Sequence, residues 1–251
     1  MENTQLKSKQ ILYVGSPELC TNYRWEKKSE LLNPKIGLVC VNDIISAKQS
    51  GIEIMTCNNA PIYEGLVLVN HPFKNNTYMD VMLAEDELFR QKLDAIGTIA
   101  RHLGVTSFTA KAKFENIRKY EFEANGKVKL GSYVNLEANY RHQEEEKYAM
   151  QYSREEHFPG KYDMDDYREA QKLVNQYQLS ELKYLLEQRN PHFANSLCSQ
   201  KIRTELSKEM NDITECAFSL SILGGCIAIG GSLKETLSTQ KKVILETELI
   251  F

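Results

Sequence analysis

The sequence lacks the short motifs by which metal, nucleotide and redox sites are usually recognised. Its six cysteines form no CxxC pair, its histidines form no HExxH, and it contains no GxxxxGK[ST] phosphate loop. Three of the cysteines lie in apolar runs, where a free thiol packs as a small hydrophobic side chain. We therefore expect structural cysteines, no cofactor and no metal site.

The chain also has little excess charge of either sign. Its 31 Lys and Arg residues against 34 Asp and Glu residues give a formal net charge of -3 over 251 residues. Because nucleic-acid-binding proteins usually carry a basic patch, we expect no nucleic-acid partner. The first ten residues, MENTQLKSKQ, lack the apolar stretch of a signal peptide, and we expect a cytoplasmic location.

Long hydrophobic runs are scarce as well. The most apolar stretch is AFSLSILGGCIAIGGS at 217–232, which lies between Glu215 and Lys234. Its uncharged length falls short of the ~20 residues that a membrane-spanning helix needs. We interpret 217–232 as a buried core segment, with a membrane-associated or re-entrant segment as the alternative.

The clearest local signal is the pair Asn125-Gly126, which stands between two alternating stretches and predicts a β-hairpin. A two-residue loop would place apolar side chains opposite lysines. A three-residue loop of 124–126 instead pairs Glu123 with Lys127 and Phe122 with Val128. Oppositely charged side chains then face each other, and apolar side chains face apolar ones. The same register extends over 105–141 and predicts one long antiparallel hairpin, with a bend at 131–132.

One face of this hairpin is apolar. It consists of the even-numbered residues Phe108, Ala110, Ala112, Phe114, Tyr120, Phe122, Val128, Leu130, Val134, Leu136, Ala138 and Tyr140. The opposite face carries mainly Lys and Glu. A soluble hairpin whose apolar face is covered is the simpler interpretation; the alternative is a hairpin that inserts into a membrane, since a spanning strand needs only ~9–11 alternating residues.

Short apolar runs precede the hairpin. QILYV, KIGLVCV, IEIMTC and GLVLVN predict four strands, and Ser16-Pro17-Glu18 predicts the start of a helix that extends to about Leu32. The strands form either a small α/β sheet of their own or the edges of the hairpin's sheet. Over 79–103, a stripe of apolar residues predicts an amphipathic helix that packs on the even face of the hairpin. The stripe consists of Met82, Phe89, Leu93, Ile96, Ala100 and Leu103.

The chain after the hairpin is predicted to be mainly helical. The segment 142–158 is ambiguous: its Glu content favours a helix, its alternating apolar residues favour a strand, and we favour the strand. We expect a helix that starts in DMDDY at 163–167, a second helix from Ser180, and a long helix from about Leu197 to Leu220. The β-branched run KKVILETELIF predicts a final strand that returns to the sheet.

Two places are candidate sites. The first is the apolar face of the hairpin, and the second is the loop VNHPFKNN at 69–76, where His71 and Asn75 follow a predicted strand. For His71 a role in the turn itself is the simpler interpretation. The acids of 163–167 are most simply explained by the helix dipole rather than by a metal ion.

These patterns predict an α+β protein with a mixed N-terminal α/β segment, a sheet dominated by the hairpin of about 105–141, and a helical C-terminal third that ends in a strand. We expect one integrated domain over 1–251, with subregions 10–78, 79–158 and 159–251. We expect a non-enzymatic binding or assembly protein that acts with a protein partner or by self-association. The alternatives are a membrane-acting effector that inserts the hairpin, and an enzyme with a site on the N-terminal segment that no motif reveals.

Overall fold

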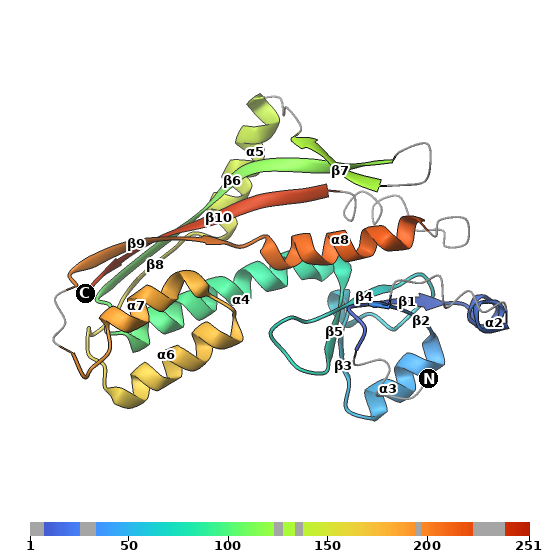
Figure 1. The fold of residues 1–251 in the computed structure, drawn as a ribbon, viewed down its shortest axis with the longest axis horizontal. Coiled ribbons are helices and arrows are strands. Elements are labelled where there is room, and N and C mark those ends of the chain that lie inside the picture. The colour runs from blue at the N-terminus through green and yellow to red at the C-terminus, as the bar shows by residue number, and fades with distance from the viewer. Residues whose placement is uncertain (1–7, 26–33, 123–127, 134–137, 194–196, 223–238) are drawn as a thin grey trace. The chain divides into compact units, whose positions relative to one another are not determined.

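The computed structural model describes residues 8–25, 34–122, 128–133, 138–193, 197–222 and 239–251, and it contains helices and two separate sheets (Figure 1). The chain is therefore an α+β protein, as predicted. Two compact units are present. Unit 1 comprises the described residues within 1–86, 117–133 and 209–240, and unit 2 those within 87–116, 134–208 and 241–251. The single integrated domain stays a prediction.

Unit 1 contains a five-stranded sheet of its own, which decides between the two alternatives for the N-terminal strands. Its strands, in the order β2-β1-β4-β5-β3, are β1 (Ile11–Gly15), β2 (Ile36–Cys40), β3 (Glu53–Met55), β4 (Val67–Asn70) and β5 (Thr77–Asp80). β1 runs parallel to β2 and antiparallel to β4, and β5 lies between β4 and β3. The core of this unit includes Leu12, Val14, Ile44, Leu68 and Tyr78.

Two helices and one short turn connect these strands. They are α2 (Pro17–Trp25), α3 (Val41–Gln49) and the 3-10 turn η2 (Cys57–Asn59). Ser16 caps α2 as predicted, since its Oγ accepts a hydrogen bond from the N–H of Leu19 at 3.1 Å. The predicted end of this helix near Leu32 lies outside the described residues.

The sequence did not reveal strand β5. Helix α4 (Val81–His102) begins two residues later than predicted, because Met79 and Asp80 extend β5. Both are fully or nearly buried, and Met79 pairs with Val69 of β4 and with Met55 of β3. A strand this short between a loop and a long helix leaves no alternation that a sequence pattern can detect.

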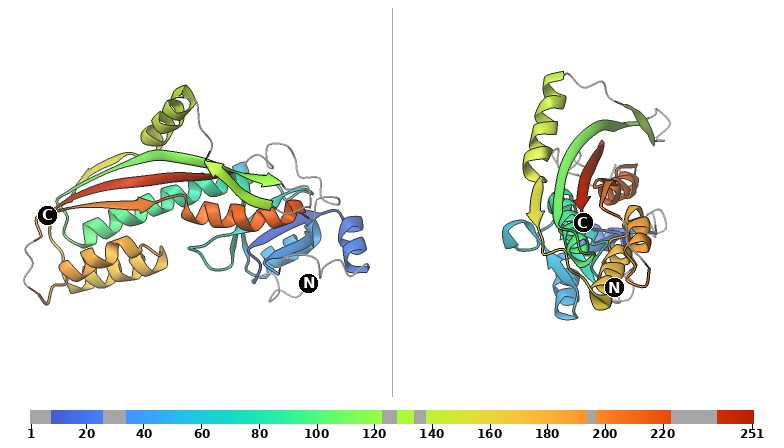
Figure 2. Two further views of the ribbon diagram at one scale, coloured as in Figure 1. Left: turned by 45° about the horizontal axis from the view of Figure 1, so that its top comes forward. Right: turned by 90° about the vertical axis from the view of Figure 1, so that its left-hand side faces the viewer.

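Most of the second sheet belongs to unit 2, whereas its described residues within 117–133 belong to unit 1; its long strands lie side by side in Figures 1 and 2. Its strands are β6 (Ser107–Phe122), β7 (Val128–Tyr133), β8 (Arg154–His157), β9 (Ser199–Glu205) and β10 (Thr239–Ile250). The order is β7-β6-β10-β9, and β8 pairs with the beginning of β6. The final strand predicted from the sequence is thus β10, which lies between β6 and β9.

The tip of the hairpin has the predicted register at three pairs: Tyr120 with Leu130, Glu121 with Lys129, and Phe122 with Val128. The register then shifts, because Arg118 faces Tyr133. Between these pairs, one residue of β6, Lys119, therefore lies opposite two of β7, Gly131 and Ser132, where the bend was predicted. The second arm ends at Tyr133 in the described structure.

The prediction of one hairpin over 105–141 is therefore wrong at 138–141, while 134–137 lie outside the described residues. Ala138 and Tyr140 lie in helix α5 (Ala138–Gln151), and so does most of the segment 142–158 that we expected to be a strand; only β8 is a strand there. Residues 138–151 are rich in Ala, Glu, Gln and Met, which favour helix. The alternation of apolar residues predicted that Tyr148 and Met150 share one buried face, but Tyr148 is buried whereas Met150 is 86% exposed.

The C-terminal third contains one more strand than predicted. Helix α6 (Met164–Gln176), turn η3 (Ser180–Leu182) and helix α7 (Lys183–Gln188) match the expected helices, and α6 packs against α7 (Figure 2). The long helix expected from Leu197 instead divides into β9 and helix α8 (Lys208–Ile222). In β9, buried Ile202 and Thr204 alternate with exposed Lys201 and Arg203, and all seven residues pair with β10.

The described part of the even face of β6 belongs to the core. Phe108, Ala110, Ala112 and Phe114 are buried. Their neighbours come from two helices: the ring of Phe108 lies beside Gly97 of α4, and the ring of Phe114 stacks on Tyr148 of α5 at a centroid distance of 6.0 Å. The predicted stripe of α4 is buried except for Met82, which is exposed.

The most apolar stretch, 217–232, lies largely outside the described residues. Its first six residues, 217–222, form the end of α8. Among the described ranges, no helix combines the length and the apolar character needed to cross a membrane.

Candidate functional site

The loop that joins β4 to β5 surrounds a concavity of about 470 Å³ in unit 1. We call it the β4–β5 concavity. It is lined by Asn70, His71, Pro72, Lys74, Asn75, Asn76 and Tyr78. Because β4 and β5 are antiparallel neighbours, with Asn70 paired to Tyr78, this loop is the turn of a short hairpin, and all of its lining residues come from one segment. Both residues of the predicted loop site, His71 and Asn75, are among them.

His71 fixes the shape of this loop from inside. It is buried, its N–H donates to the carbonyl of Thr77 at 2.9 Å, and its Nδ1 accepts a hydrogen bond from the N–H of Phe73 at 3.1 Å. An imidazole nitrogen that accepts a hydrogen bond carries no proton, so this geometry selects the tautomer with hydrogen on Nε2. His71 thus has the turn-forming role that the sequence favoured, while it also lines the concavity.

Asn75 and Asn76 form the rim of the concavity. Asn76 has a left-handed backbone, with φ of 55°, a conformation that asparagine tolerates well. The carbonyls of both residues are bound within the protein: that of Asn75 accepts from Thr77 Oγ1 at 3.2 Å, and that of Asn76 accepts from the N–H of Glu53 in β3 at 2.9 Å. In the part of the chain that the structure describes, neither their backbone N–H groups nor their side-chain amides take part in a hydrogen bond.

Tyr78 closes the inner side. Its hydroxyl donates to the carbonyl of Lys9 at 2.7 Å, and burial raises the pKa of Tyr78 to about 12. The phenol therefore stays protonated and keeps this hydrogen bond over the whole physiological range. None of the seven lining residues is acidic, and Lys74 contributes a cation.

The other candidate site, the apolar face of the hairpin, is only partly described. Phe108, Ala110, Ala112 and Phe114 are covered by side chains of unit 2 and are not exposed for binding. Six further residues lie where the structure describes no side chains: Tyr120, Phe122, Val128, Leu130, Val134 and Leu136. As a binding face these residues stay a prediction.

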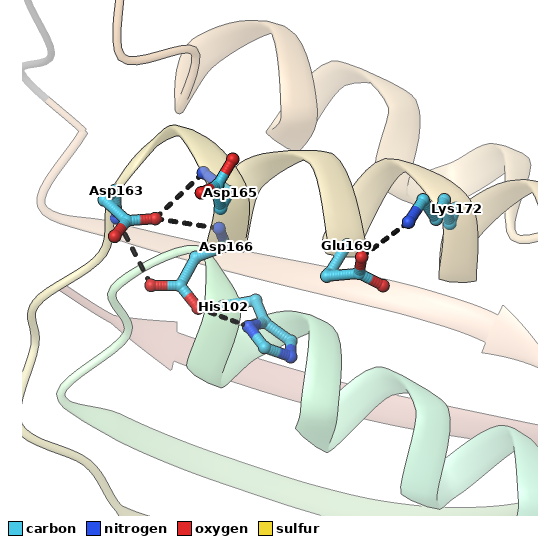
Figure 3. A network of polar contacts seen from close by, with 6 residues as sticks. All are labelled: His102, Asp163, Asp165, Asp166, Glu169 and Lys172. Atoms are coloured by element: carbon cyan, nitrogen blue, oxygen red, sulfur yellow. Dashed lines mark hydrogen bonds and ion pairs between the residues drawn. The ribbon is translucent and has the colours of Figure 1, made fainter.

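The acids of 163–167 take part in a network that joins α6 to the end of α4 (Figure 3). Asp163 caps α6, because its Oδ1 accepts from the N–H groups of Asp165 and Asp166 at 2.9 Å. Asp166 in turn binds His102 Nδ1 at 2.7 Å, and this hydrogen bond lowers the pKa of Asp166. These carboxylates have structural partners within the protein, as the helix-dipole interpretation anticipated.

A second concavity, of about 580 Å³, lies in unit 2 between α4 and β8. Its central cation, Arg154, binds Asp94 through Nη1 and Glu156 through Nε, each at 2.6 Å. Arg101 also lines this concavity, so that two cations, Arg101 and Arg154, accompany two anions, Asp94 and Glu156. The charges of this concavity therefore neutralise one another, and no ligand class is favoured.

Comparison with known proteins gives no match: no family model, curated protein or solved structure is similar to this chain. Of the residues that line the β4–β5 concavity, the sequence pointed to His71 and Asn75 as candidates, and their role as a site stays a prediction; Asn70, Pro72, Lys74, Asn76 and Tyr78 were not named as candidates. All of them lie within residues 69–78. They could not be grouped from the sequence because strand β5 was not predicted, and it is β5 that fixes the second end of this loop in the sheet.

Proposed function

We propose that this chain is a non-enzymatic binding protein whose ligand site is the β4–β5 concavity. The observation that carries the proposal is that one loop combines internally hydrogen-bonded residues with exposed amide groups. The buried His71 and the hydrogen bonds of Thr77 hold the loop in place, while exposed amide groups of Asn75 and Asn76 remain available to a ligand. A preformed concavity with a few polar groups is typical of small-molecule sites.

The test is a titration with small polar compounds, followed through the backbone N–H signals of Asn75 and Asn76 in NMR spectra. The compounds are amino acids, glucose and inorganic phosphate. We expect saturable shifts with at least one class. Asn75→Trp, which fills the concavity from its exposed rim, should abolish them, whereas Asn42→Trp at an exposed position of α3 should not.

Two results contradict this proposal. One is the absence of any saturable shift at these two residues. The other is chemical conversion of a bound compound during incubation, which would favour the enzyme alternative. That the protein acts with a protein partner or by self-association stays a separate prediction, which this experiment does not address.

A second candidate function is that of a membrane-acting effector, and helix α5 favours it. Among the described side chains of α5, at 141–151, only Tyr148 is buried. Tyr148 stacks on Phe114, and Lys241 Nζ lies 3.1 Å from its hydroxyl. A helix with a single buried residue among its described side chains is easier to displace than one with a full apolar stripe.

This candidate is tested by dye release from liposomes made with and without anionic lipid. Tyr148→Ala should increase release, because it loosens α5, while Met150→Ala on the exposed side of the same helix should not. No release from either variant, with both still folded, contradicts the membrane-acting function.

Ala112→Asp is expected to unfold the protein. Ala112 is fully buried, and an unpaired carboxylate in a core costs several kcal/mol even after relaxation. Thermal melting followed by circular dichroism measures this, with Lys111→Asp on the exposed face of β6 as the control. A folded Ala112→Asp variant would mean that the even face is not core.

A further inference from the structure

Arg189, the residue that follows helix α7, is a buried cation of unit 2. It is 8% exposed, and burial lowers the pKa of Arg189, although an arginine stays charged at any physiological pH. Among the described residues, its one hydrogen bond runs from Nε to the carbonyl of Leu103 at 2.9 Å, and no carboxylate forms an ion pair with it. A buried charge without a counter-ion is costly, and proteins accept such costs mainly at functional sites.

The surroundings of Arg189 leave one part of its guanidinium group for a ligand. The rings of Tyr162 and Phe251 lie against the group, with centres 4.7 Å and 4.3 Å from its central carbon. Leu103 occupies the Nε side. The N–H bonds of Nη1 and Nη2 remain, and no acceptor in the described part of the chain receives them. These two groups form a planar fork, which a carboxylate matches with two parallel hydrogen bonds.

Gly104 keeps the space beside this fork open. A Cβ atom at position 104 would lie 3.0 Å from Arg189 Nη2, so a side chain there would crowd the fork. Gly104 has a left-handed φ of 73°, a conformation that glycine adopts without strain. The turn at the end of α4 therefore supplies both the carbonyl that holds Nε and the free space next to Nη2.

We infer that Arg189 binds the carboxylate group of a small soluble molecule through Nη1 and Nη2. Arg189 supplies one positive charge, which matches a carboxylate better than the ~2 negative charges of a phosphate group. Because Arg189 is nearly enclosed, only a small group reaches it. The site shares no residue with the β4–β5 concavity and does not depend on the function proposed for it.

The test is a titration of the full chain with sodium acetate at about pH 7, where acetate is ionised, and at constant ionic strength. It is followed by the NMR signals of the Nε and Nη groups of Arg189. Sodium chloride and inorganic phosphate are the comparison probes. We expect saturable shifts with acetate, and a melting temperature that rises with acetate concentration, since a ligand of the folded state stabilises it by mass action.

A pair of variants isolates the planar fork. Arg189→Lys keeps the positive charge but loses the fork, and it should weaken acetate binding at least about tenfold. Arg168→Lys is the matched control, because Arg168 is an exposed arginine of α6 in the same unit, and it should leave acetate binding unchanged. If Arg189→Lys does not fold, the titration of the unsubstituted protein still decides.

Three results overturn the inference. Shifts at Arg189 that are as large with chloride as with acetate would mean that any anion acts there without specificity. Saturation with phosphate but not with acetate would exclude a carboxylate as the ligand. No saturable shift at Arg189 with any probe would confine its role to holding the end of α4. None of these results bears on the β4–β5 concavity, whose ligand is followed at Asn75 and Asn76.

Discussion

Arg189 lies between two aromatic rings near the end of α4. Its guanidinium carbon is 4.7 Å from the ring centre of Tyr162 and 4.3 Å from that of Phe251, and its Nε donates to the carbonyl of Leu103 at 2.9 Å. Cation–π contacts of this kind are worth more when the cation is removed from water, and Arg189 is 8% exposed. The next residue after Leu103, Gly104, leaves room for this arrangement.

Gly104→Ala is predicted to destabilise the protein by about 2–4 kcal/mol. Gly104 has a left-handed φ of 73°, and a Cβ atom there would lie 2.5 Å from Tyr162 Cδ1 and 3.0 Å from Arg189 Nη2. Urea unfolding measures the loss. Gly51→Ala is the matched control, because Gly51 also has a left-handed φ, of 89°, but nothing lies within 4 Å of its Cβ position. Equal losses in both variants would show that the contact with Tyr162 and Arg189 is unimportant.

At the scale of elements, ion pairs connect strands β6, β9 and β10 on the solvent face of the second sheet. Glu115 of β6 binds Lys242 of β10 at 2.7 Å and Arg203 of β9 at 2.5 Å. Lys113 binds Glu246 in the same way at 2.6 Å. This face is therefore charged and mixed in sign, and the opposite face is core. Such a two-faced sheet explains why the alternation along β6 was easy to detect.

Glu115→Gln is predicted to destabilise the protein at neutral pH but not at low pH. The hydrogen bond from Lys242, reinforced by Arg203, lowers the pKa of Glu115 below its usual value of 4.5. The folded state therefore favours the ionised carboxylate, whose contribution is present above the usual pKa and disappears as the pH falls through the lowered one. Urea unfolding of both proteins at about pH 7 and about pH 3 measures the difference.

The control for this experiment is Glu187→Gln, since Glu187 is exposed on α7 and no ion pair involves it among the described residues. It should change stability little at either pH. A loss for Glu115→Gln that is the same at both values would contradict the role of its charge.

At the scale of the whole molecule, the chain passes between the two units several times. Helix α4, strand β6 and helix α8 each have residues in both. A continuous helix or strand transmits loss of structure from one unit to the other. We therefore expect the two units to unfold together, as the prediction of one integrated domain requires.

Leu68→Ala in unit 1 and Phe108→Ala in unit 2 test this expectation. Both side chains are fully buried, and each truncation should cost about 2–5 kcal/mol. Thermal unfolding followed by circular dichroism and by calorimetry should show one transition, which both variants lower. Two transitions, each lowered by only one of the variants, would mean two independent domains.

The sequence by itself determined the features that depend on neighbouring residues. Alternation defined β6 and its buried face, Ser16 and Asp163 marked two helix starts, and the Asn-Gly pair set the register of the hairpin tip. His71 and Asn75 lie in one short loop and line one concavity, which is also a local feature; their role as a site stays a prediction.

Only the tertiary structure determined the secondary structure of segments whose local pattern fits more than one conformation. Residues 138–151 fit a strand by alternation and a helix by composition. They form helix α5, in which Tyr148 stacks on Phe114 of β6. Ser199–Glu205 became a strand because β10, about 40 residues later in the chain, offered a complete set of backbone partners. A local pattern records the preference of a segment, but hydrogen bonding and burial against remote segments contribute more free energy than that preference.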